Sequence, residues 1–461
     1  MTNSPYQKLL TATRSRPTTV PSGSSIVEAS ASDRSRVIYS APFRRLQQKA
    51  QVFSLESNAS VRSRLTHSLE VADVGRRIAQ KVVNKLYQDR LIGMEESAPF
   101  VTIVETACLM HDIGNPPFGH FGEAAIQEWA ETLPTRRPGL GEKIQALKSL
   151  SQFDGNPQGV RVVCRLQSDP LEMGKQPTEG LNLTYTQLLA SLKYLRVAGQ
   201  DHSSGFLKKP GFFESERSTI EKAWKAMEYD PEKPRRHPLV FIVEAADDIA
   251  YCMSDLEDGV ENGLVSKDQV LKSMLALPRL SNPGKELTFL GAKIKYASTM
   301  IDRAATQYLK QHEDIIAGKL DQAILDIDQE DKETLKGLKK FARAYLFNTE
   351  AIEFTELSGF AVVRGLLSRF EGLLELERDK FQLLLDARSN QGDWRGKGLD
   401  TAKRLVGRLP EKHVAAYHAC VKEGIPEIDC RAHLIVDYVA GMTDNFALET
   451  HRTLSGIQKH R

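Results

Sequence analysis

One segment concentrates the chemically active side chains of this sequence: LMHDIGNPPFGHFGE, residues 109–123. A largely apolar run at 101–110 leads into it and predicts a buried helix that ends at His111 and Asp112. Gly-Asn-Pro-Pro then interrupts the helix, because proline lacks a backbone N–H and cannot continue it. His120 and Glu123 follow at the predicted start of a new helix. Two histidines and two carboxylates around a sharp turn indicate a metal site with acid–base groups beside it.

The composition of the chain is that of a soluble globular protein. Its 461 residues are 41% hydrophobic and 26% charged, with a formal net charge of +2. No apolar run reaches the roughly 18 residues of a membrane span, and the first residues lack a signal-peptide core. The five cysteines form no CxxC pair, which favours free thiols and a cytoplasmic location. The net charge does not predict a nucleic-acid binder, although a local basic patch stays open.

Helical patterns dominate the chain, so we predict an all-α fold with at most a short β element, for which residues 351–354 are a candidate. Apolar residues recur every three to four positions from Leu65 to Leu86, which predicts an amphipathic helix. Residues 1–25 are rich in Ser, Thr, Pro and Arg and lack any period, which predicts a flexible or loosely docked arm. A core at 26–260 and a helical C-terminal region at 261–461 follow.

Two further metal ligands are needed beside His111 and Asp112, and two candidates lie on predicted helices. His67 stands four residues before Val71, so it points to the same buried face. The alternative is a hydrogen-bonded core histidine. Asp247, Tyr251 and Asp255 recur every four residues, so one helical face presents a carboxylate, a phenol and a second carboxylate. The alternative is a helix N-terminal acidic cluster or ion pairs with nearby arginines. A His/His/Asp/Asp set suits Mn, Fe, Co, Ni, Mg or Zn, and the lack of a cysteine argues against structural zinc.

His120 and Glu123 share one helical face, which suits proton transfer. A histidine titrates near neutral pH, and a carboxylate beside it fixes its tautomer and raises its pKa. The alternative is a glutamate that caps the helix beginning near Gly119, with His120 merely packed.

A set of ordered motifs resembles the HD-domain superfamily in its dNTP triphosphohydrolase branch, and most closely the bacterial dGTP triphosphohydrolases. The resemblance spans roughly residues 25–450. The motifs are RSRLTHSLE at 62–70, HDIGNPPFGH at 111–120, SDRSRVI at 32–38, FRRLQQKAQVF at 43–53, FDGNPQ at 153–158, EAADDIAY at 244–251 and AGMTD at 440–444.

The resemblance implies a role for each matching position. The metal set is His67, His111, Asp112 and Asp247, with Mn or Mg favoured and Co, Ni, Fe or Zn possible ions. The catalytic pair is His120 and Glu123. Substrate contacts divide by the part of the nucleotide. Gln51 and Asp255 would bind the deoxyribose 3′-OH, and Tyr251 would contact the sugar face. The phosphates would be bound by Arg64, Lys193 and Lys209. The base would be contacted by Phe347, Ile352, Glu356 and Arg404.

The implied reaction is metal-dependent hydrolysis of dGTP at the α-phosphorus by an activated water, which releases deoxyguanosine and inorganic triphosphate. The resemblance also implies a cytoplasmic homo-oligomer, a hexamer by family analogy, whose C-terminal region contributes base-pocket and oligomer contacts. One alternative is a general dNTP triphosphohydrolase regulated by a nucleotide or by single-stranded DNA. Another is an HD-type phosphodiesterase. A third class is a nucleic-acid-binding protein using the basic loop pairs Arg136-Arg137, Lys208-Lys209 and Arg235-Arg236.

Overall fold

The computed structural model describes residues 4–18, 25–56, 58–167, 180–201, 204–281, 287–389, 394–395 and 397–457. Across these ranges the fold is all-α, as predicted, and its named strands are one short parallel pair, β1 (Arg196–Val197) and β2 (Pro210–Phe212). No helix in the described ranges is long and apolar enough to cross a membrane.

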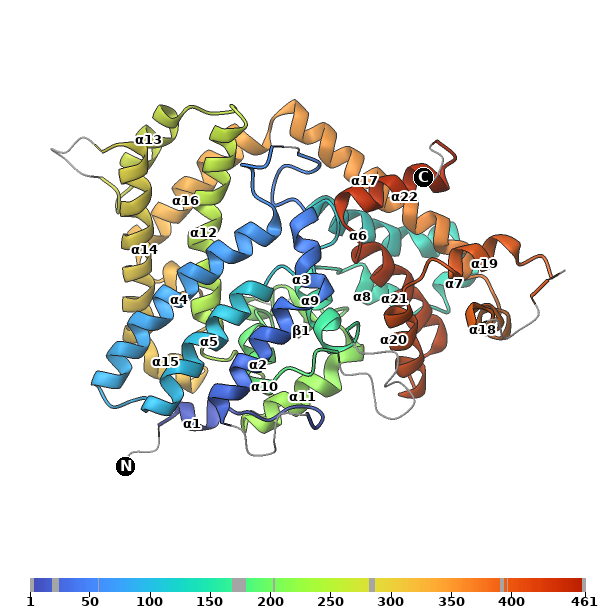
Figure 1. Cartoon of the computed structure of the whole chain (residues 1–461), viewed down its shortest axis with the longest axis horizontal. Coiled ribbons are helices and arrows are strands. Elements are labelled where there is room, and N and C mark those ends of the chain that lie inside the picture. Colours follow the sequence, from blue (N-terminus) through green and yellow to red (C-terminus); the bar gives the residue numbers. More distant parts are fainter. Residues whose placement is uncertain are drawn as a thin grey trace.

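The helices follow one another along the chain (Figure 1). Those before residue 262 are α1 (Tyr6–Leu9), α2 (Ile26–Ile38), α3 (Ala41–Arg45), α4 (Arg64–Gln88), α5 (Met94–Met110), α6 (Gly119–Arg136), α7 (Pro138–Gly141), α8 (Leu147–Leu150), α9 (Gly155–Cys164), α10 (Tyr185–Ala190), α11 (Arg217–Ala226) and α12 (Val240–Glu261). The later ones are α13 (Lys267–Leu275), α14 (Phe289–Lys310), α15 (His312–Ala317), α16 (Gln329–Ala342), α17 (Glu350–Phe370), α18 (Arg378–Asp386), α19 (Asp400–Val406), α20 (Glu411–Lys422), α21 (Glu427–Ala440) and α22 (Asp444–Leu454).

Helices α4, α5 and α12 pack side by side and form the centre of the first of two hydrophobic cores (Figure 1). Helix α4 begins at a capping box, in which the Ser63 side chain accepts the Thr66 N–H. Its predicted apolar face is buried, with Val71, Ile78 and Val82 fully inaccessible. Burial of a whole helical face in this way contributes most of the stability of such a helix. The predicted amphipathic helix is therefore confirmed.

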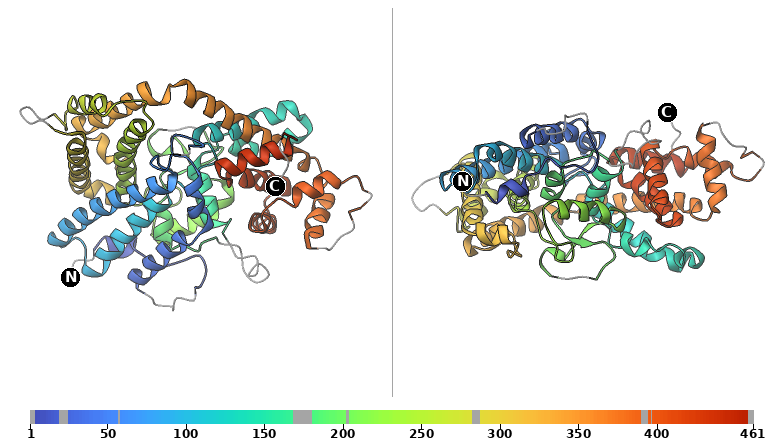
Figure 2. Two further views of the ribbon diagram at one scale, coloured as in Figure 1. Left: turned by 45° about the horizontal axis from the view of Figure 1, so that its top comes forward. Right: turned by 90° about the horizontal axis from the view of Figure 1, so that it is seen from below.

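Two hydrophobic cores divide the described chain, and their division does not follow the predicted boundary at residue 260. The first core unites α4, α5 and α12 with α14 and α16. The second unites α6 and α8 with α17–α22. Figure 2 shows α14 and α16 at one end of the molecule and the last helices at the other, with α17 running between them. Helices distant in sequence thus share a core because they are adjacent in space.

Residues 4–18 of the N-terminal arm are packed against the protein rather than loosely attached, which corrects the expectation for this part of the arm. Tyr6 is fully buried, and its hydroxyl lies 3.1 Å from both the Tyr308 hydroxyl and His312 Nε2. Leu9 and Leu10 are also buried. These apolar side chains, scattered without a period, gain enough burial to dock the segment.

Residues 351–354 lie inside helix α17, so the strand considered for them is wrong. The four residues are too few to show a helical period alone, but the apolar spacing of the whole segment to Phe370 is helical, and α17 packs along α6.

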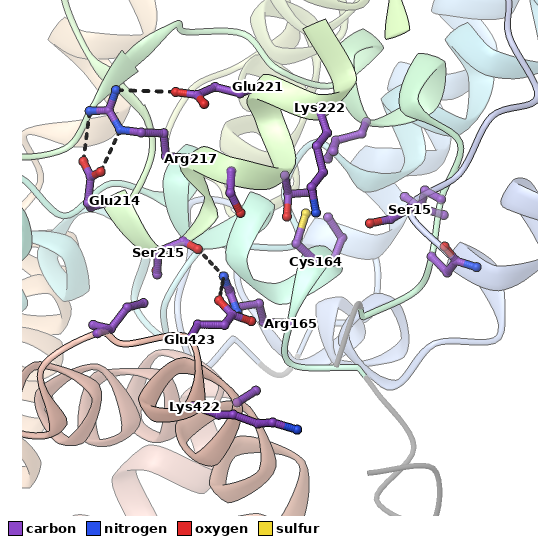
Figure 3. Close-up of a pocket in the computed structure, with 18 of the residues that line it drawn as sticks. Ser15, Cys164, Arg165, Glu214, Ser215, Arg217, Glu221, Lys222, Lys422 and Glu423 are labelled. Carbon is purple, nitrogen blue, oxygen red and sulfur yellow. Dashed lines mark hydrogen bonds and ion pairs between the residues drawn. The ribbon is translucent and has the colours of Figure 1, made fainter. Parts of the chain in front are cut away.

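The seam between the central helices and the C-terminal region is held by buried ion pairs. Arg161 of α9 donates to Asp437 of α21 at 2.8 Å and to Glu216 at 3.1 Å, and all three are almost completely buried. Beside them, Arg165 donates to Glu423 at 2.9 Å and to the backbone of Ser215 (Figure 3). A cavity of about 700 Å³ opens along this seam.

We expect Asp437→Ala to lower the free energy of unfolding by about 3–5 kcal/mol, because it leaves the buried Arg161 guanidinium with too few partners. Denaturant or thermal unfolding measures the loss. Asp89→Asn is the matched control, because the Lys85–Asp89 pair lies exposed on α4 and such pairs contribute little. Equal stability of the two variants would contradict a stabilising role for the seam.

Candidate active site

A cavity of about 510 Å³ lies between the two cores and collects most of the predicted site residues. Its walls come from α4, the α5–α6 turn, the start of α9, helix α12 and the first turns of α17. Its predicted lining residues are Gln51, Arg64, His67, His111, Asp112, His120, Glu123, Lys193, Lys209, Asp247, Tyr251, Phe347, Ile352 and Glu356.

The four predicted metal ligands converge in this cavity from three elements. One donor atom each from His67, His111 and Asp112 lies within 4.8 Å of the others. Asp247 Oδ1 lies 3.4 Å from His67 Nε2 and 3.6 Å from His111 Nε2. Burial raises the pKa of the Asp247 carboxyl, but His111, His67 and Lys193 outweigh it and hold this pKa well below its usual range. The Asp247 carboxylate is therefore ionised and can bind a cation.

His67 tests whether these residues fit a metal. Its side chain is fully buried, and neither ring nitrogen makes a hydrogen bond within the described part of the protein. Such an unsatisfied buried group is unfavourable and uncommon. A divalent ion at Nε2 would satisfy it, so the donor set fits a metal site better than a packed core histidine.

Neighbouring groups orient the other ligands. His111 Nδ1 donates to the Cys108 carbonyl at 2.7 Å, which leaves Nε2 with a lone pair facing Asp247. Asp112 accepts Arg64 Nη1 at 2.9 Å and the Asn115 side-chain amide. Burial raises the pKa of Asp112, but the charges of Arg64 and the two histidines lower this pKa by more than burial raises it. The carboxylate therefore stays ionised.

Arg62 fixes the distance between the two helices that carry His67 and Asp247. Its guanidinium, just before α4, donates to Glu257 at 2.5 Å and to Asp258 at 2.7 Å, both on α12. It also reaches Glu70 on α4 at 2.8 Å. The RSRLTH motif thus carries a clamp as well as a ligand.

Close backbone packing holds the turn after Asp112. A Cβ on Gly114 would lie 2.0 Å from the Gly155 carbonyl oxygen and 2.1 Å from the Gly159 nitrogen. A Cβ on Gly155 would lie 2.5 Å from the Asn115 side-chain oxygen. Only glycine permits these approaches, so the turn and the start of α9 fit directly together.

His120 and Glu123 form a hydrogen-bonded pair at the start of α6. His120 Nδ1 lies 2.8 Å from Glu123 Oε2, and Glu123 Oε1 accepts the Gly155 N–H at 2.8 Å. Glu123 is buried, whereas the His120 side chain is 85% exposed at the cavity. The hydrogen bond that His120 Nδ1 donates to Glu123 raises the pKa of His120. An exposed imidazole with a fixed tautomer and a raised pKa can move protons at Nε2.

Comparison with known proteins agrees with this geometry. The HD domain family matches residues 64–189, and the phosphohydrolase-associated domain family matches residues 401–453. Three relatives are named deoxyguanosinetriphosphate triphosphohydrolase. The relative from Klebsiella pneumoniae subsp. pneumoniae is 34% identical (93% of this chain, 94% of the relative), that from Cronobacter sakazakii 35% (96% of both) and that from Yersinia pseudotuberculosis 34% (96% and 97%).

The chain belongs to the HD-domain dNTP triphosphohydrolase family. The chain is therefore an enzyme, an HD-domain hydrolase. The HD match contains His67, His111, Asp112 and the His120–Glu123 pair, whereas Asp247 lies beyond its end.

Two predicted substrate residues of this family member lie outside the cavity lining. Asp255 is buried one helical turn beyond Tyr251 on α12. Arg404 lies on α19, far out in the C-terminal region (Figure 1), with a 73% exposed side chain 3.6 Å from Asp400. The structure of one chain therefore does not bring Arg404 to the base pocket, because α19 packs beside α18 in the second core.

Sequence reasoning missed three side chains that organise this hydrolase site. Asp154 caps α9 through the Asn156 N–H and holds Lys209 at 2.8 Å. Asn115 binds the ligand Asp112, and Glu244 lies 3.7 Å from Lys193. The Asp-Gly-Asn sequence before α9 is a helix-start signal that could have located Asp154. No local pattern marks the other two.

We expect Asp247→Ala to weaken Mn²⁺ binding by at least about 100-fold, because loss of a ligand exceeds the effect of losing a residue that merely orients one. A Mn²⁺ titration followed by electron paramagnetic resonance measures the change without any substrate. The control is Asp248→Asn, since this neighbour pairs with Lys339 at 2.6 Å instead of facing the histidines. Wild-type Mn²⁺ affinity in Asp247→Ala would remove Asp247 from the site.

Proposed function

We propose that the protein hydrolyses dGTP to deoxyguanosine and inorganic triphosphate, with a divalent metal held by His67, His111, Asp112 and Asp247. The observation that carries the proposal is the presence, in one nucleotide-sized cavity, of this ligand set and the His120–Glu123 pair. The names of the relatives support the choice of substrate.

Three cations in the cavity would bind the triphosphate. Arg64, Lys193 and Lys209 each lie against a carboxylate: Asp112, Glu244 and Asp154 respectively. Burial lowers the pKa of each of the two lysines, but these carboxylates outweigh it and keep both ammonium groups charged. Cations held in place in this way bind phosphate oxygens strongly. The carboxylates hold the cations in place until substrate arrives.

The sugar site rests on buried polar groups that lack partners. Within the described residues, Gln51 Oε1 and both carboxyl oxygens of Asp255 are buried and make no hydrogen bond. Burial raises the pKa of Asp255 to about 8, so at neutral pH its carboxyl group is protonated and can donate as well as accept. A deoxyribose 3′-OH would satisfy Gln51, which lines the cavity. Asp255 lies one helical turn beyond Tyr251, outside the lining, so its contact with the 3′-OH stays a prediction. Tyr251 would cover the sugar face and exclude a 2′-OH.

The base site is supported on one side. Phe347, Ile352 and Glu356 line the cavity where α17 begins, and Glu356 would accept hydrogen bonds from guanine N1–H and N2–H. The position of Arg404 removes a second guanine contact from the single chain. That observation favours a second candidate, a dNTP triphosphohydrolase with relaxed base choice.

The chain's own residues suit hydrolysis at the α-phosphorus. A divalent ion, when bound, would supply polarisation of a phosphoryl oxygen and a lowered pKa for a coordinated water. The basic side chains neutralise the phosphates. His120 is charged at a higher pH than an ordinary histidine because of Glu123, so it is suited to protonate the departing 5′-oxygen from Nε2. A homo-oligomeric assembly and regulation by single-stranded DNA stay predictions.

Product analysis with dGTP, dATP, dCTP, dTTP and GTP in Mn²⁺ or Mg²⁺ tests the proposal. We expect deoxyguanosine and inorganic triphosphate from dGTP, with GTP the poorest substrate because of Tyr251. Pyrophosphate and dGMP would contradict the cleavage site. Equal rates on dGTP and dATP would select the relaxed dNTP triphosphohydrolase over the dGTP enzyme.

We expect Glu123→Gln to shift the alkaline limb of the kcat/KM profile toward lower pH. The hydrogen bond that His120 donates to Glu123 raises the pKa of His120. Its removal makes His120 lose its proton at a lower pH, so general-acid activity falls at a lower pH. Steady-state rates across pH 5–9, a range of roughly two units on either side of the histidine value, measure the shift. Glu128→Gln is the control, because Glu128 lies half exposed on α6 near Arg364. An unmoved alkaline limb would remove the general-acid role.

A further inference from the structure

Asp444, the first residue of α22, directs its carboxylate to the backbone of two segments of the active-site wall instead of capping its own helix. The capping bond of α22 comes from Thr443, whose side chain accepts the Phe446 N–H. Asp444 is 3% exposed. Its Oδ1 accepts the Phe118 N–H at 3.0 Å, and its Oδ2 accepts the Ala50 N–H at 3.0 Å. One buried carboxylate therefore joins two segments that line the cavity.

Phe118 needs such a contact because its backbone is strained. Its φ is 60°, in the left-handed region that a bulky residue rarely adopts, and Gly119 follows with φ 55°. These two residues end the turn that begins at Asp112 and start the helix that carries His120. On its other side, the Phe118 ring packs on α17, where a Cβ at Gly359 would lie 2.5 Å from Cγ. Surrounding contacts must hold this conformation.

Ala50 belongs to the segment that carries Gln51 and supports the start of α4. It forms a β-bridge with Ser63, and the Lys49 carbonyl accepts the Arg64 N–H at 2.9 Å. The buried Lys49 ammonium also donates to the Ala440 carbonyl at 3.0 Å and to the Asn115 carbonyl. The end of α21 and the start of α22 thus contact both sides of the metal-bearing turn.

We propose that Asp444 is a positioning residue of the active site, which sets the distance between the metal ligands, the His120–Glu123 pair and the Gln51 segment. This inference rests on the proposed function only for the choice of nucleotide substrate. It gives the phosphohydrolase-associated region a part in turnover. This region contributes no reacting atom, but its Asp444 carboxylate binds the backbone N–H groups of Phe118 and Ala50 and so holds the site together.

The test is Asp444→Asn. An asparagine keeps one acceptor oxygen but turns its NH2 toward the other backbone N–H, so one of the two segments is released. We expect kcat to fall about 10- to 100-fold, because a small misplacement of the reacting groups costs about that much. Mn²⁺ affinity should stay within about threefold, since such an asparagine touches no ligand, and the pH profile of the remaining activity should keep its shape because His120 and Glu123 stay paired.

Asp429→Asn is the matched control. Asp429 is also a buried carboxylate of the C-terminal region, and it accepts the Ala146 N–H at 2.9 Å away from the cavity. A merely structural role for Asp444 predicts similar losses of thermal stability in both variants with kcat unchanged. A wild-type kcat in Asp444→Asn overturns the proposal, and so does a loss of Mn²⁺ binding that explains the whole fall in rate.

Two further measurements keep the test decisive. If Asp444→Asn does not fold, Gly359→Ala displaces Phe118 from its opposite side, and the same fall in kcat with Mn²⁺ affinity retained is expected; an unchanged kcat overturns the proposal. Hydrolysis of bis(p-nitrophenyl) phosphate with Mn²⁺ reports metal-centred chemistry without a base or a sugar. If the unmodified protein hydrolyses this ester but no dNTP, the proposed function is refuted, and the effect of Asp444→Asn can still be measured on the ester.

Discussion

Negative charge in the cavity is the constraint on which the surrounding structure depends. Asp112 is buried and Asp247 lines the cavity, and an unpaired carboxylate in such a place is costly by several kcal/mol. Arg64 from α4 and Lys193 supply opposite charge, and the two imidazoles lower the pKa of both acids. Four donor atoms still converge on one point with few hydrogen bonds among them. A divalent cation is the group that resolves this arrangement.

Holding those donors in place requires rigid geometry around a sharp turn. The Gly114–Gly155 approach fixes one end of the turn, and the left-handed Phe118 fixes the other. Between them the chain passes from the predicted ligand Asp112 to the His120–Glu123 pair. Because Glu123 accepts the Gly155 N–H, the start of α9 aligns both the turn and His120. The backbone of this turn, held also by the Asp444 carboxylate, therefore sets the distance between the predicted metal ligands and the His120–Glu123 pair.

The sequence predicted what depends on local pattern. The amphipathic α4, the break after Asp112 and the adjacency of His120 and Glu123 are properties of short segments, and the structure brings His67 and Asp247 to them. Prediction from the sequence failed where the outcome depends on packing between segments that are distant in the chain. Nothing near Tyr6 signals burial against Tyr308, and nothing near Arg404 signals that α19 turns away from the cavity. From the sequence, Asp444 resembles an ordinary acidic residue in the first turn of a helix. Its partners lie more than 300 residues earlier, so no local pattern indicates them.

The location of the cavity between two cores explains why an HD motif alone does not make this site. His120 lies on α6, which belongs to the second core, whereas the metal ligands belong to helices of the first. Helix α17 carries Ile352 and Glu356 and also touches Phe118 through Gly359. The predicted base contacts and the His120–Glu123 pair therefore share one helix interface, α6 against α17. A shift of α17 that widens the space beside Ile352 and Glu356 must also move Phe118, so under the proposed function base selectivity and turnover are coupled.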